Sequence, residues 1–486
     1  MENQLVRRIT LISAITLVVS SIIGSGVYKK AGKMSLELGS PKLVLLAWIL
    51  AGVVSLFGAL SNAEIAGMMA DSGGEYVYFR RIYGRFMSFI FGWSIFSIIK
   101  TASVSSIAYV FAQSLNNIIP LPHLPESIET MQFWIFMPFQ DAGIKAVTIL
   151  LIVALTFLNT RGLKGGELFS NWITRLVILG LSLIVITGMF SGHGSVENLT
   201  MPSANYVERS WTDITLISSL FTAMLAAFWG YEGWNTVGFL GGEIQNPNKN
   251  LPLALFGGLL IVMTAYILVN ATYHYLMPID DLMQIGQKGS NKVAAIEAIR
   301  TYGGDLGSKF LSLIILITTL GCTNSTIIMP PRMYYAMAKD GLFFRAAAEI
   351  DPVTKTPNNA LWMQCVWACA LVLSGNFDQL TDMLIFAAFF FYGATALGVF
   401  ILRVKEPNAE RPYKTWGYPI VPAIFVLFCI TLIVNTLWKS PEESGKGLFL
   451  MLTGLPFYYH WTKEKWALWA SVVFGVALLV YFVYGL

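Results

Sequence analysis

Two short stretches decide how this chain folds: Ile22-Ile23-Gly24-Ser25-Gly26-Val27 and Phe228-Trp229-Gly230-Tyr231-Glu232-Gly233-Trp234-Asn235. Each places a pair of glycines near the middle of a long apolar segment. A glycine inside a helix costs about 1 kcal/mol relative to alanine, and a backbone group freed in hydrocarbon must find a partner or line a wet cavity. Close helix packing would explain a single pair. Two pairs in corresponding places predict two interrupted helices that frame a binding site.

The composition is that of an integral membrane protein. The hydrophobic set makes up 55% of the 486 residues and the charged set only 12%, whereas a soluble domain is roughly 25% charged. The length allows about twelve spans of about 20 residues with short connections. The net charge is +4, and the basic residues are spread over the predicted connections, which excludes the clustered surface of a nucleic-acid-binding protein.

Apolar windows place the predicted spans along the whole chain. We predict them at residues 9–31, 43–69, 86–115, 144–160, 170–189, 214–241, 253–276, 310–337, 360–373, 383–402, 421–438 and 447–459. Residues 466–486 are also apolar, so a thirteenth span is an open alternative. The longest polar connection, residues 279–308, is too short to build a soluble domain. Trp93, Trp438 and Trp461 are expected at the membrane interfaces.

The distribution of basic residues predicts the orientation. Counted over alternate connections, lysine and arginine are more frequent on the side of the N-terminus. Arg80, Arg81 and Arg85 contribute to this bias, while Lys29 and Lys30 run against it. We therefore expect a multi-pass protein of the plasma (inner) membrane with a cytoplasmic N-terminus.

The sequence gives little support to an enzyme or a channel. The four histidines are scattered, and no metal-binding or nucleophile-elbow pattern occurs. The four cysteines all fall in apolar stretches, which predicts packing residues rather than a metal site. A channel would need a symmetric filter repeat or rings of like charge, and the sequence has neither. We therefore expect no catalytic residue, metal or cofactor, and we keep enzyme and channel as remote alternatives.

The predicted helix breaks have a chemistry of their own. The N-terminus of a half-helix offers unpaired N–H groups and the positive end of a dipole to a carboxylate. Exposed carbonyls at the C-terminus of a half-helix accept hydrogen bonds from an ammonium group. A zwitterionic amino acid fits such a site.

Several motifs beyond the glycine stretches look like those of one family. They are Asn62-Ala-Glu-Ile65, Ser72-Gly-Gly-Glu-Tyr76, Gly242-Glu-Ile-Gln-Asn-Pro-Asn-Lys-Asn-Leu-Pro252, Pro331-Arg-Met-Tyr-Tyr-Ala-Met-Ala-Lys-Asp-Gly341, Arg411-Pro-Tyr-Lys414 and Gly417-Tyr-Pro419. With the two glycine stretches, they make the chain resemble the amino acid–polyamine–organocation superfamily, and within it the L-type amino acid transporter group.

The resemblance implies an all-α membrane fold of the LeuT type, a five-plus-five inverted repeat with twelve core transmembrane helices. Helices 1 to 5 would lie in residues 1–192 and helices 6 to 10 in residues 212–402. Helices 11 and 12 would follow in residues 417–460, and the extra segment in residues 466–486. The resemblance also implies that no sodium is required.

The family places the substrate at the two breaks. The backbone at the positions of Gly24, Ser25 and Gly26 holds the substrate carboxylate, and the aromatic residue at the position of Trp229 caps the pocket. The carbonyls near Trp229 and Gly230 would face the amine. The candidate substrate-binding residues are Ile23, Gly24, Ser25, Gly26, Val27, Trp229, Gly230, Tyr231, Glu232, Gly233 and Asn235.

The chain departs from the family at two ionisable positions. Arg175 stands where most related members have a lysine, at the place where sodium-coupled relatives hold an ion. A guanidinium could substitute for that cation and brace helices 1 and 8, but could not shuttle a proton. A snorkelling arginine near a helix end is the alternative. Glu232 stands where many animal members have glycine, and it would either change protonation during transport or bind freed backbone N–H groups.

Coupling and partners are also predicted from the resemblance. Thr323 and Asn324 in helix 8 could face Arg175 or the site and take part in coupling, although such groups often serve only helix packing. Animal members that pair with an accessory glycoprotein use a cysteine between helices 3 and 4. This chain has none there, so we expect no disulfide-linked accessory subunit.

The function expected from these observations is sodium-independent transport of neutral amino acids by alternating access, with exchange (antiport) as the preferred mode. Proton-coupled symport through Glu232 is one alternative. Transport of a cationic amino acid or a polyamine is another, because a cationic side chain would need a carboxylate in the pocket. Glu232 is the only obvious carboxylate there.

Overall fold

The computed structural model describes residues 9–69, 74–131, 133, 136–161, 166–235, 244–287, 290–354 and 356–484, and every regular element in these ranges is a helix. Parts of the predictions fall outside them. These are residues 236–241 of the predicted sixth span and the motif residues Ser72, Gly73, Gly242 and Glu243.

The first half of the chain holds the helices that we assigned to spans 1 to 5. They are α1 (Leu11–Ile22), α2 (Gly26–Lys29), α3 (Ala31–Leu38), α4 (Pro41–Met68), α5 (Glu75–Tyr83), α6 (Arg85–Ser94), the π-helix η1 (Ile95–Ile99), α7 (Lys100–Ile118), α8 (Glu126–Glu129), α9 (Ala142–Thr160) and α10 (Gly166–Met189). Span 1 is therefore interrupted between Ile22 and Gly26, as predicted from its glycines.

The second half holds the remaining helices. They are α11 (Ile214–Tyr231), α12 (Pro247–Leu276), α13 (Ile279–Ile285), α14 (Ala294–Ile328), α15 (Pro331–Lys339), α16 (Asn358–Ser374), α17 (Phe377–Lys405), α18 (Ile420–Lys439), α19 (Pro441–Leu452), α20 (Gly454–Thr462) and α21 (Lys465–Tyr484). Short 3₁₀ turns lie at Glu197–Leu199 and Arg345–Ala348.

Eight stretches of helix in the described residues are long and apolar enough to cross a membrane. They are Pro41–Met68, Arg85–Ile118, Ala142–Thr160, Ile214–Tyr231, Lys249–Leu276, Ala294–Lys339, Phe377–Lys405 and Ile420–Lys439. Leu11–Ile22 and Arg175–Met189 are shorter apolar helices. An all-helical fold with this many apolar spans confirms the predicted class of membrane protein.

Two boundaries differ from the prediction. The predicted span 310–337 is longer: helix begins at Ala294, bends at Gly304, where φ is +57°, and is interrupted again near Pro330. The connection 279–308 is therefore mostly helical. Its helix α13 packs on α3, and Gly32 and Gly286 are so close that a Cβ on Gly32 would lie 2.9 Å from the Gly286 nitrogen. Because α13 is short and lies in a polar stretch, its apolar periodicity is too brief to be recognised in the sequence.

Trp93 also differs from the prediction. It was expected at an interface, yet it is buried, and its Nε1 donates to Thr453 Oγ1 at 3.0 Å. Trp438 is 83% exposed, in keeping with an interface position.

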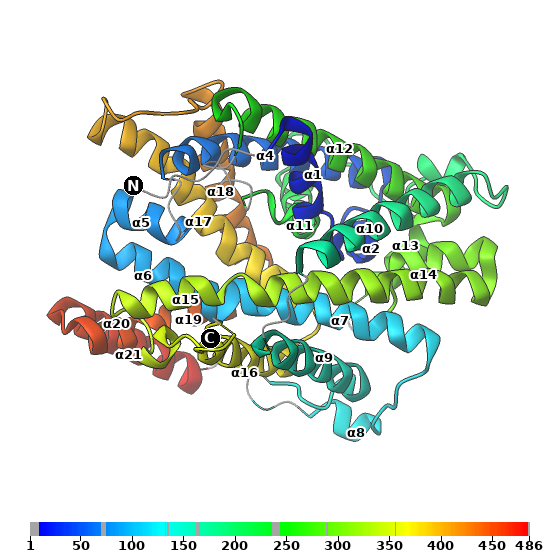
Figure 1. The fold of residues 1–486 in the computed structure, drawn as a ribbon. Coiled ribbons are helices and arrows are strands. Elements are labelled where there is room, and N and C mark those ends of the chain that lie inside the picture. Colours follow the sequence, from blue (N-terminus) through cyan, green and yellow to red (C-terminus); the bar gives the residue numbers. More distant parts are fainter. Residues whose placement is uncertain are drawn as a thin grey trace.

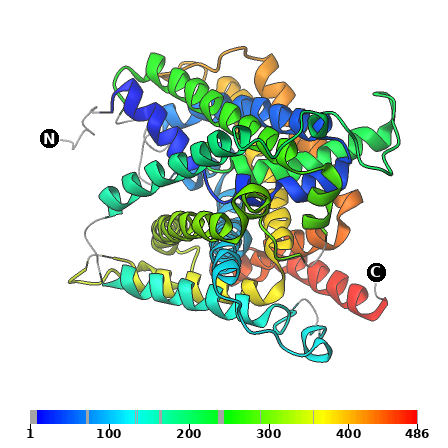
Figure 2. The same ribbon diagram turned by 90° about the vertical axis from the view of Figure 1, so that its right-hand side faces the viewer.

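The long helices form two groups with the breaks between them. In Figure 1, α14 and α7 run side by side through the middle of the molecule, with α9 and α16 below them. α1, α4, α11 and α12 lie above, and they pack on one another. Figure 2 keeps α12 and α9 on opposite sides after a turn of 90°. α17 packs against both groups, through α4 and α7.

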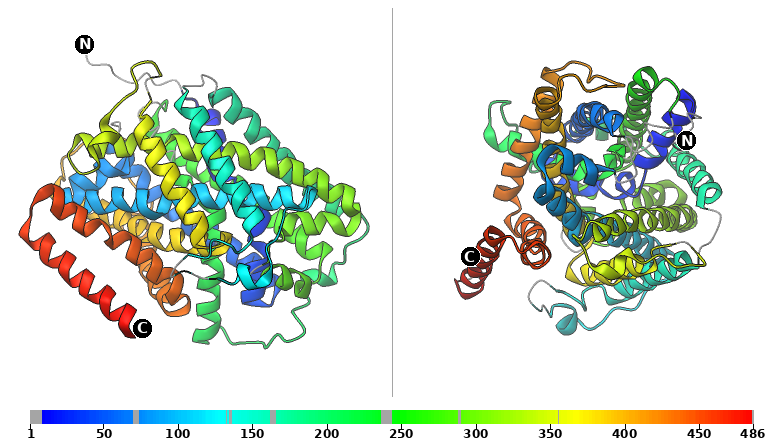
Figure 3. Two further views of the ribbon diagram at one scale, coloured as in Figure 1. Left: turned by 90° about the horizontal axis from the view of Figure 1, so that it is seen from below. Right: turned by 60° about the vertical axis from the view of Figure 1, so that its left-hand side comes forward.

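The C-terminal helix α21 lies at the edge of this arrangement. It packs on α20 and runs along the outside of the bundle (Figure 3). The ring of Trp466 meets the ring of Phe86 edge to face, at 4.6 Å between centroids, which fixes the start of α21 against α6.

Candidate functional site

The break in the first span meets the end of α11. α1 ends in an extended residue, Ile23, and helix resumes at Gly26. A Cβ on Gly26 would lie 2.6 Å from the Cα of Gly230, so only glycine permits this approach. Two residues after α11 ends, Gly233 has a φ of +115°, and a Cβ there would lie 2.1 Å from the carbonyl oxygen of Ser21. The glycines predicted to break the helices therefore also let them touch.

Tyrosines on α12 satisfy carbonyls that the breaks release. The hydroxyl of Tyr266 lies 2.8 Å from the Gly230 carbonyl oxygen and 3.4 Å from that of Ile22. The hydroxyl of Tyr273 donates to the Val27 carbonyl at 3.3 Å. Freed backbone groups at membrane depth need such partners. Because a carbonyl oxygen has two lone pairs, the Gly230 carbonyl still has an acceptor position to offer.

Polar groups near the breaks lack partners within the described chain. The Oγ of Ser25 and the Nε1 of Trp229 are buried and make no hydrogen bond to the described residues. A buried donor left unsatisfied costs about 1–3 kcal/mol. Trp229 packs edge to face on Phe377, the first residue of α17, at 6.2 Å between centroids. The indole thus lies between the end of α11 and the start of α17.

Glu232, the acidic residue inside the second break, is paired. Its Oε1 lies 3.4 Å from the Nζ of Lys100, and its two oxygens lie 2.9 and 2.8 Å from the hydroxyl of Tyr392. Lys100 is the residue that sequence reasoning missed. The signal was present, because a lysine inside an apolar span is expensive and is a functional candidate by default.

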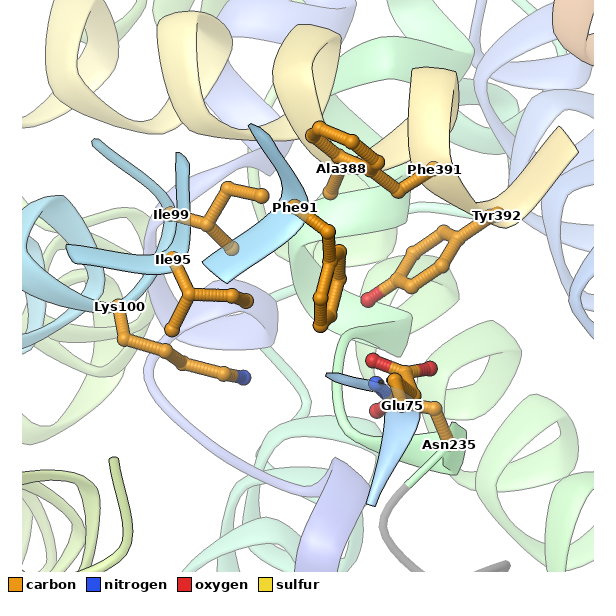
Figure 4. Close-up of a pocket in the computed structure, with 9 residues that line it drawn as sticks. All are labelled: Glu75, Phe91, Ile95, Ile99, Lys100, Asn235, Ala388, Phe391 and Tyr392. Carbon is orange, nitrogen blue, oxygen red and sulfur yellow. Dashed lines mark hydrogen bonds between the residues drawn. The ribbon is translucent and has the colours of Figure 1, made fainter. Parts of the chain in front are cut away.

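A small cavity opens beside this pair (Figure 4). Its lining residues are Glu75, Phe91, Ile95, Ile99, Lys100, Asn235, Ala388, Phe391 and Tyr392. The Nδ2 of Asn235 donates to Glu75 Oε1 at 3.3 Å. Four separate elements therefore bring an acidic, a basic, an amide and a phenol group to one small volume: α5, α7, the segment after α11, and α17.

Glu75 has an unusual protonation equilibrium. It begins α5, a short helix between two spans, and its side chain is buried. Burial raises the pKa of Glu75 to about 7, although the hydrogen bond from Asn235 and the charge of Lys100 lower it and the charge of Glu232 raises it further. The sequence showed Glu75 only as part of a motif.

A π-helical turn shapes the wall of the cavity. η1 (Ile95–Ile99) interrupts helix 3 directly before Lys100, and the Thr101 hydroxyl donates to the Phe96 carbonyl at 2.8 Å. Such bulges are frequent at functional sites because they turn side chains out of the regular helical register. Ile95, Ile99 and Lys100 all line the cavity. Apolar periodicity cannot reveal a single π turn, so the sequence did not predict it.

The structure does not bring Arg175 to this site. Its side chain is exposed, whereas Val177, Leu181 and Ile184 form the buried face of α10. At 3.6 residues per turn, that periodicity turns Arg175 away from the buried face. This placement favours the snorkelling alternative. The role of Arg175 as a cation that braces helices 1 and 8 stays a prediction, without support from its position.

Thr323 and Asn324 have partners elsewhere. The Thr323 hydroxyl donates to the Thr319 carbonyl one turn earlier. The Oδ1 of Asn324 accepts from Asn159 Nδ2 on α9 at 2.7 Å. These bonds are typical of helix packing, so a coupling role for both residues remains untested.

Charged clusters lie at both ends of the bundle. At one end, Lys30 is fully buried, with its Nζ 2.6 Å from Asp378 and 3.7 Å from Asp382, and Lys33 also binds Asp382. At the other end, Glu64 accepts from Arg403 at 2.9 and 2.7 Å. The first cluster joins the first span to the start of α17, and the second joins α4 to the end of α17.

Comparison with known proteins agrees with this architecture. The family model described as "Amino acid permease" matches residues 9–461. The serine/threonine exchanger SteT of Bacillus subtilis (strain 168) is 29% identical over 467 residues, which cover 96% of this chain and 99% of that protein. The human b(0,+)-type amino acid transporter 1 is 27% identical, over 97% of this chain and 91% of its own.

A third relative is similar over most of this chain. The human large neutral amino acids transporter small subunit 2 is 28% identical, over 93% of this chain and 80% of its own. Since the family model covers almost the whole sequence, including both helix breaks, this chain belongs to the amino acid permease family.

Proposed function

We propose that this protein is a sodium-independent exchanger of neutral amino acids that works by alternating access. One observation carries the proposal: the break in the first span touches the last turn of α11 at Gly26 and Gly230, with unsatisfied donors and available carbonyl acceptors at the same place. The start of α2 would receive the carboxylate, and the Gly230 carbonyl would receive the ammonium group. The relatives named as exchanger and amino acid transporters support this assignment.

The charge of the pocket favours neutral over cationic substrates. Glu232 would attract a cationic side chain, but Lys100 lies 3.4 Å from it and offsets its charge. A substrate with a basic side chain would therefore meet a compensated carboxylate. This pairing is the reason to prefer neutral amino acids over the alternative of cationic amino acids or polyamines.

The arrangement of the chain in the membrane is part of the proposal. We infer a cytoplasmic N-terminus in the plasma (inner) membrane, with the Glu64 and Arg403 cluster at the inner end and the Lys30 and Asp378 cluster at the outer end. The excess of basic residues at the inner end supports this orientation. We also propose residues 1–192 and 212–402 as inverted repeats, because the first predicted span of each contains a pair of glycines near its middle.

No covalent partner is proposed. The four cysteines lie in α14, α16 and α18, inside the bundle, and none precedes helix 4. A disulfide to an accessory subunit would need a thiol on a connection outside the membrane. The amino acid would cross without chemical change.

Transport into liposomes tests the proposal. Purified protein in sodium-free liposomes should take up labelled serine or leucine only when unlabelled amino acid is inside. The label should be recovered as the same compound. A strict requirement for external sodium would refute the proposal. Uptake into empty liposomes driven by an inward proton gradient would instead support proton-coupled symport, with Glu232 and Glu75 as the first residues to mutate.

A further inference from the structure

A second cavity lies at the end of the bundle where α6 begins, apart from the site described above. It is lined by Arg85, Gly341, Phe343, Phe344, Arg345, His460, Trp461 and Lys463. Arg85 is the first residue of α6, Arg345 begins the turn after α15, and Lys463 follows the end of α20. Three segments that are distant in sequence therefore contribute one basic residue each, and none of the described residues that line the cavity is acidic.

These basic side chains are not neutralised by the protein. Arg85, Arg345 and Lys463 are exposed, and within the described ranges no ion pair joins them to a carboxylate. Their neighbours behave differently: Arg80 pairs with Asp340, and Arg81 lies 2.5 Å from Glu406. The cavity thus gathers positive charge that no carboxylate of the described residues pairs with, whereas the neighbouring Arg80 and Arg81 are neutralised.

The carboxylate that follows Lys463 in the sequence is engaged elsewhere. Glu464 follows Lys463 directly, but its Oε1 accepts from the Tyr458 hydroxyl at 2.9 Å and its Oε2 accepts from the Trp466 indole at 2.6 Å. Both hydrogen bonds hold the carboxylate on α20 and α21. It is not among the lining residues of the cavity.

Aromatic rings form the apolar wall of the same cavity. Trp461 meets Phe344 edge to face at 5.5 Å and Phe343 at 6.3 Å between centroids. The neighbouring rings of Phe89 and Trp93 lie 5.9 and 6.4 Å from Trp461. A rim of basic groups over packed aromatic rings at the end of a membrane bundle matches a molecule with an anionic head and an apolar body.

We propose that this cavity binds the phosphodiester headgroup of an anionic phospholipid. The guanidinium groups of Arg85 and Arg345 would receive the phosphate oxygens, since the planar donors of arginine fit phosphate in a bidentate manner. Lys463 would add a point charge, and the acyl chains would lie against the aromatic wall. A bound lipid would connect the start of α6, the turn after α15 and the end of α20. None of these segments contributes Glu232 or the glycine breaks.

Lipid retention during native mass spectrometry tests this proposal. Wild-type protein is titrated with phosphatidylglycerol or phosphatidylcholine, and the bound molecules are counted. The site variant R85Q/R345Q/K463Q should bind phosphatidylglycerol about tenfold more weakly than wild type and leave phosphatidylcholine unchanged. The matched control R332Q/K339Q/K249Q removes the same formal charge from exposed positions that do not line the cavity, and it should bind as wild type does.

Three results would overturn the proposal. They are equal retention by wild type and the site variant, an equal loss in the control variant, and complete displacement of phosphatidylglycerol by millimolar inorganic phosphate, which would indicate a plain anion site.

A second measurement covers a misfolded triple variant. In nanodiscs, phosphatidylglycerol with brominated chains should quench wild-type tryptophan fluorescence more than brominated phosphatidylcholine does, and W461F should remove that difference. If W461F leaves the difference intact, the lipid does not occupy this cavity.

Discussion

Lys100 is the residue on which the charge of the proposed pocket depends. A lysine and a glutamate 132 positions apart form one ion pair, and the Tyr392 hydroxyl holds the carboxylate from the other side. Removing one partner of a poorly solvated pair leaves an uncompensated charge, which is more harmful than removing both. The pair therefore gives a clear test at the scale of single side chains.

Replacing Lys100 with methionine should change substrate preference. With Glu232 uncompensated, lysine should compete with labelled serine about tenfold better than in wild type, equivalent to about 1.4 kcal/mol. The double variant K100M/E232Q should return to the wild-type preference. The control K446M removes a lysine whose partner, Glu442, lies on the exposed face of α19, and it should change nothing. Unaltered competition in K100M would show that the pair does not face the substrate.

Glu75 should make stability depend on pH. Its folded pKa of about 7 lies above its ordinary 4.5, so the folded state binds the proton more tightly than the unfolded state. The contribution is fully present below pH 4.5 and is lost as pH rises through 7, which amounts to on the order of 2 kcal/mol between pH 5.5 and 8.5. Melting temperatures in detergent should fall over this interval in wild type.

Glu75→Gln should flatten that dependence, because the amide stays neutral at every pH. Glu410→Gln, at an exposed position, is the control and should keep the wild-type slope. A slope in E75Q equal to that of wild type would assign the effect to another group.

At the scale of helices, the contact between the two breaks is the feature that the glycines make possible. A side chain at Gly26 would meet backbone atoms of Gly230 at 2.6 and 2.8 Å, and backbone cannot rotate out of the way as a flexible side chain can. The helices would have to separate, and the carboxylate and ammonium positions would separate with them.

Gly26→Ala should therefore lower exchange at least tenfold and cost about 1–3 kcal/mol of stability. Gly445→Ala is a suitable control, because a Cβ there meets no atom within 4 Å. Initial rates of exchange and melting curves measure both effects. Normal exchange by G26A would mean that the two breaks need not touch during transport.

Sequence predicted some of these elements and missed others for physical reasons. Glycines inside apolar spans are visible, so the break at Gly24 to Gly26 and the end of regular helix between Gly230 and Gly233 were expected. The π turn before Lys100 was not, because it shifts the register by one residue without changing the composition. Two roles were left open for Arg175, a bracing cation and a snorkelling side chain, because a single sequence does not fix which face of a uniformly apolar helix is buried. Lys100 and Glu232 could not be paired, since their contact arises from tertiary structure alone.

Over the whole molecule, charged clusters hold α17 at both of its ends. Lys30 and Asp378 lie at the proposed outer end, and Glu64 and Arg403 at the proposed inner end. In an alternating-access cycle, only one of these clusters opens at a time. Breaking either one should favour the state in which that end is open.

Lys30→Met should open the outer end. Phe377 provides the reporter. It is 1% exposed, and the centroid of its ring lies 4.8 Å from Lys30 Nζ. In an F377C background, a membrane-impermeant thiol reagent should label the new cysteine several-fold faster when K30M is present. Arg403→Met, at the other end, should slow labelling or leave it unchanged. Equal acceleration by both variants would argue against a cycle in which the two ends alternate.

The hydroxyl of Tyr266 carries one hydrogen but faces two carbonyl oxygens, that of Gly230 at 2.8 Å and that of Ile22 at 3.4 Å. It donates fully to only one of them at a time, so each broken helix competes with the other for the same proton. A displacement of either half-helix by a few tenths of an ångström would transfer the bond to its rival. Tyr266 is thus a hydrogen-bonding link that the two helices share, and a movement of one helix relative to the other would change which of them it binds.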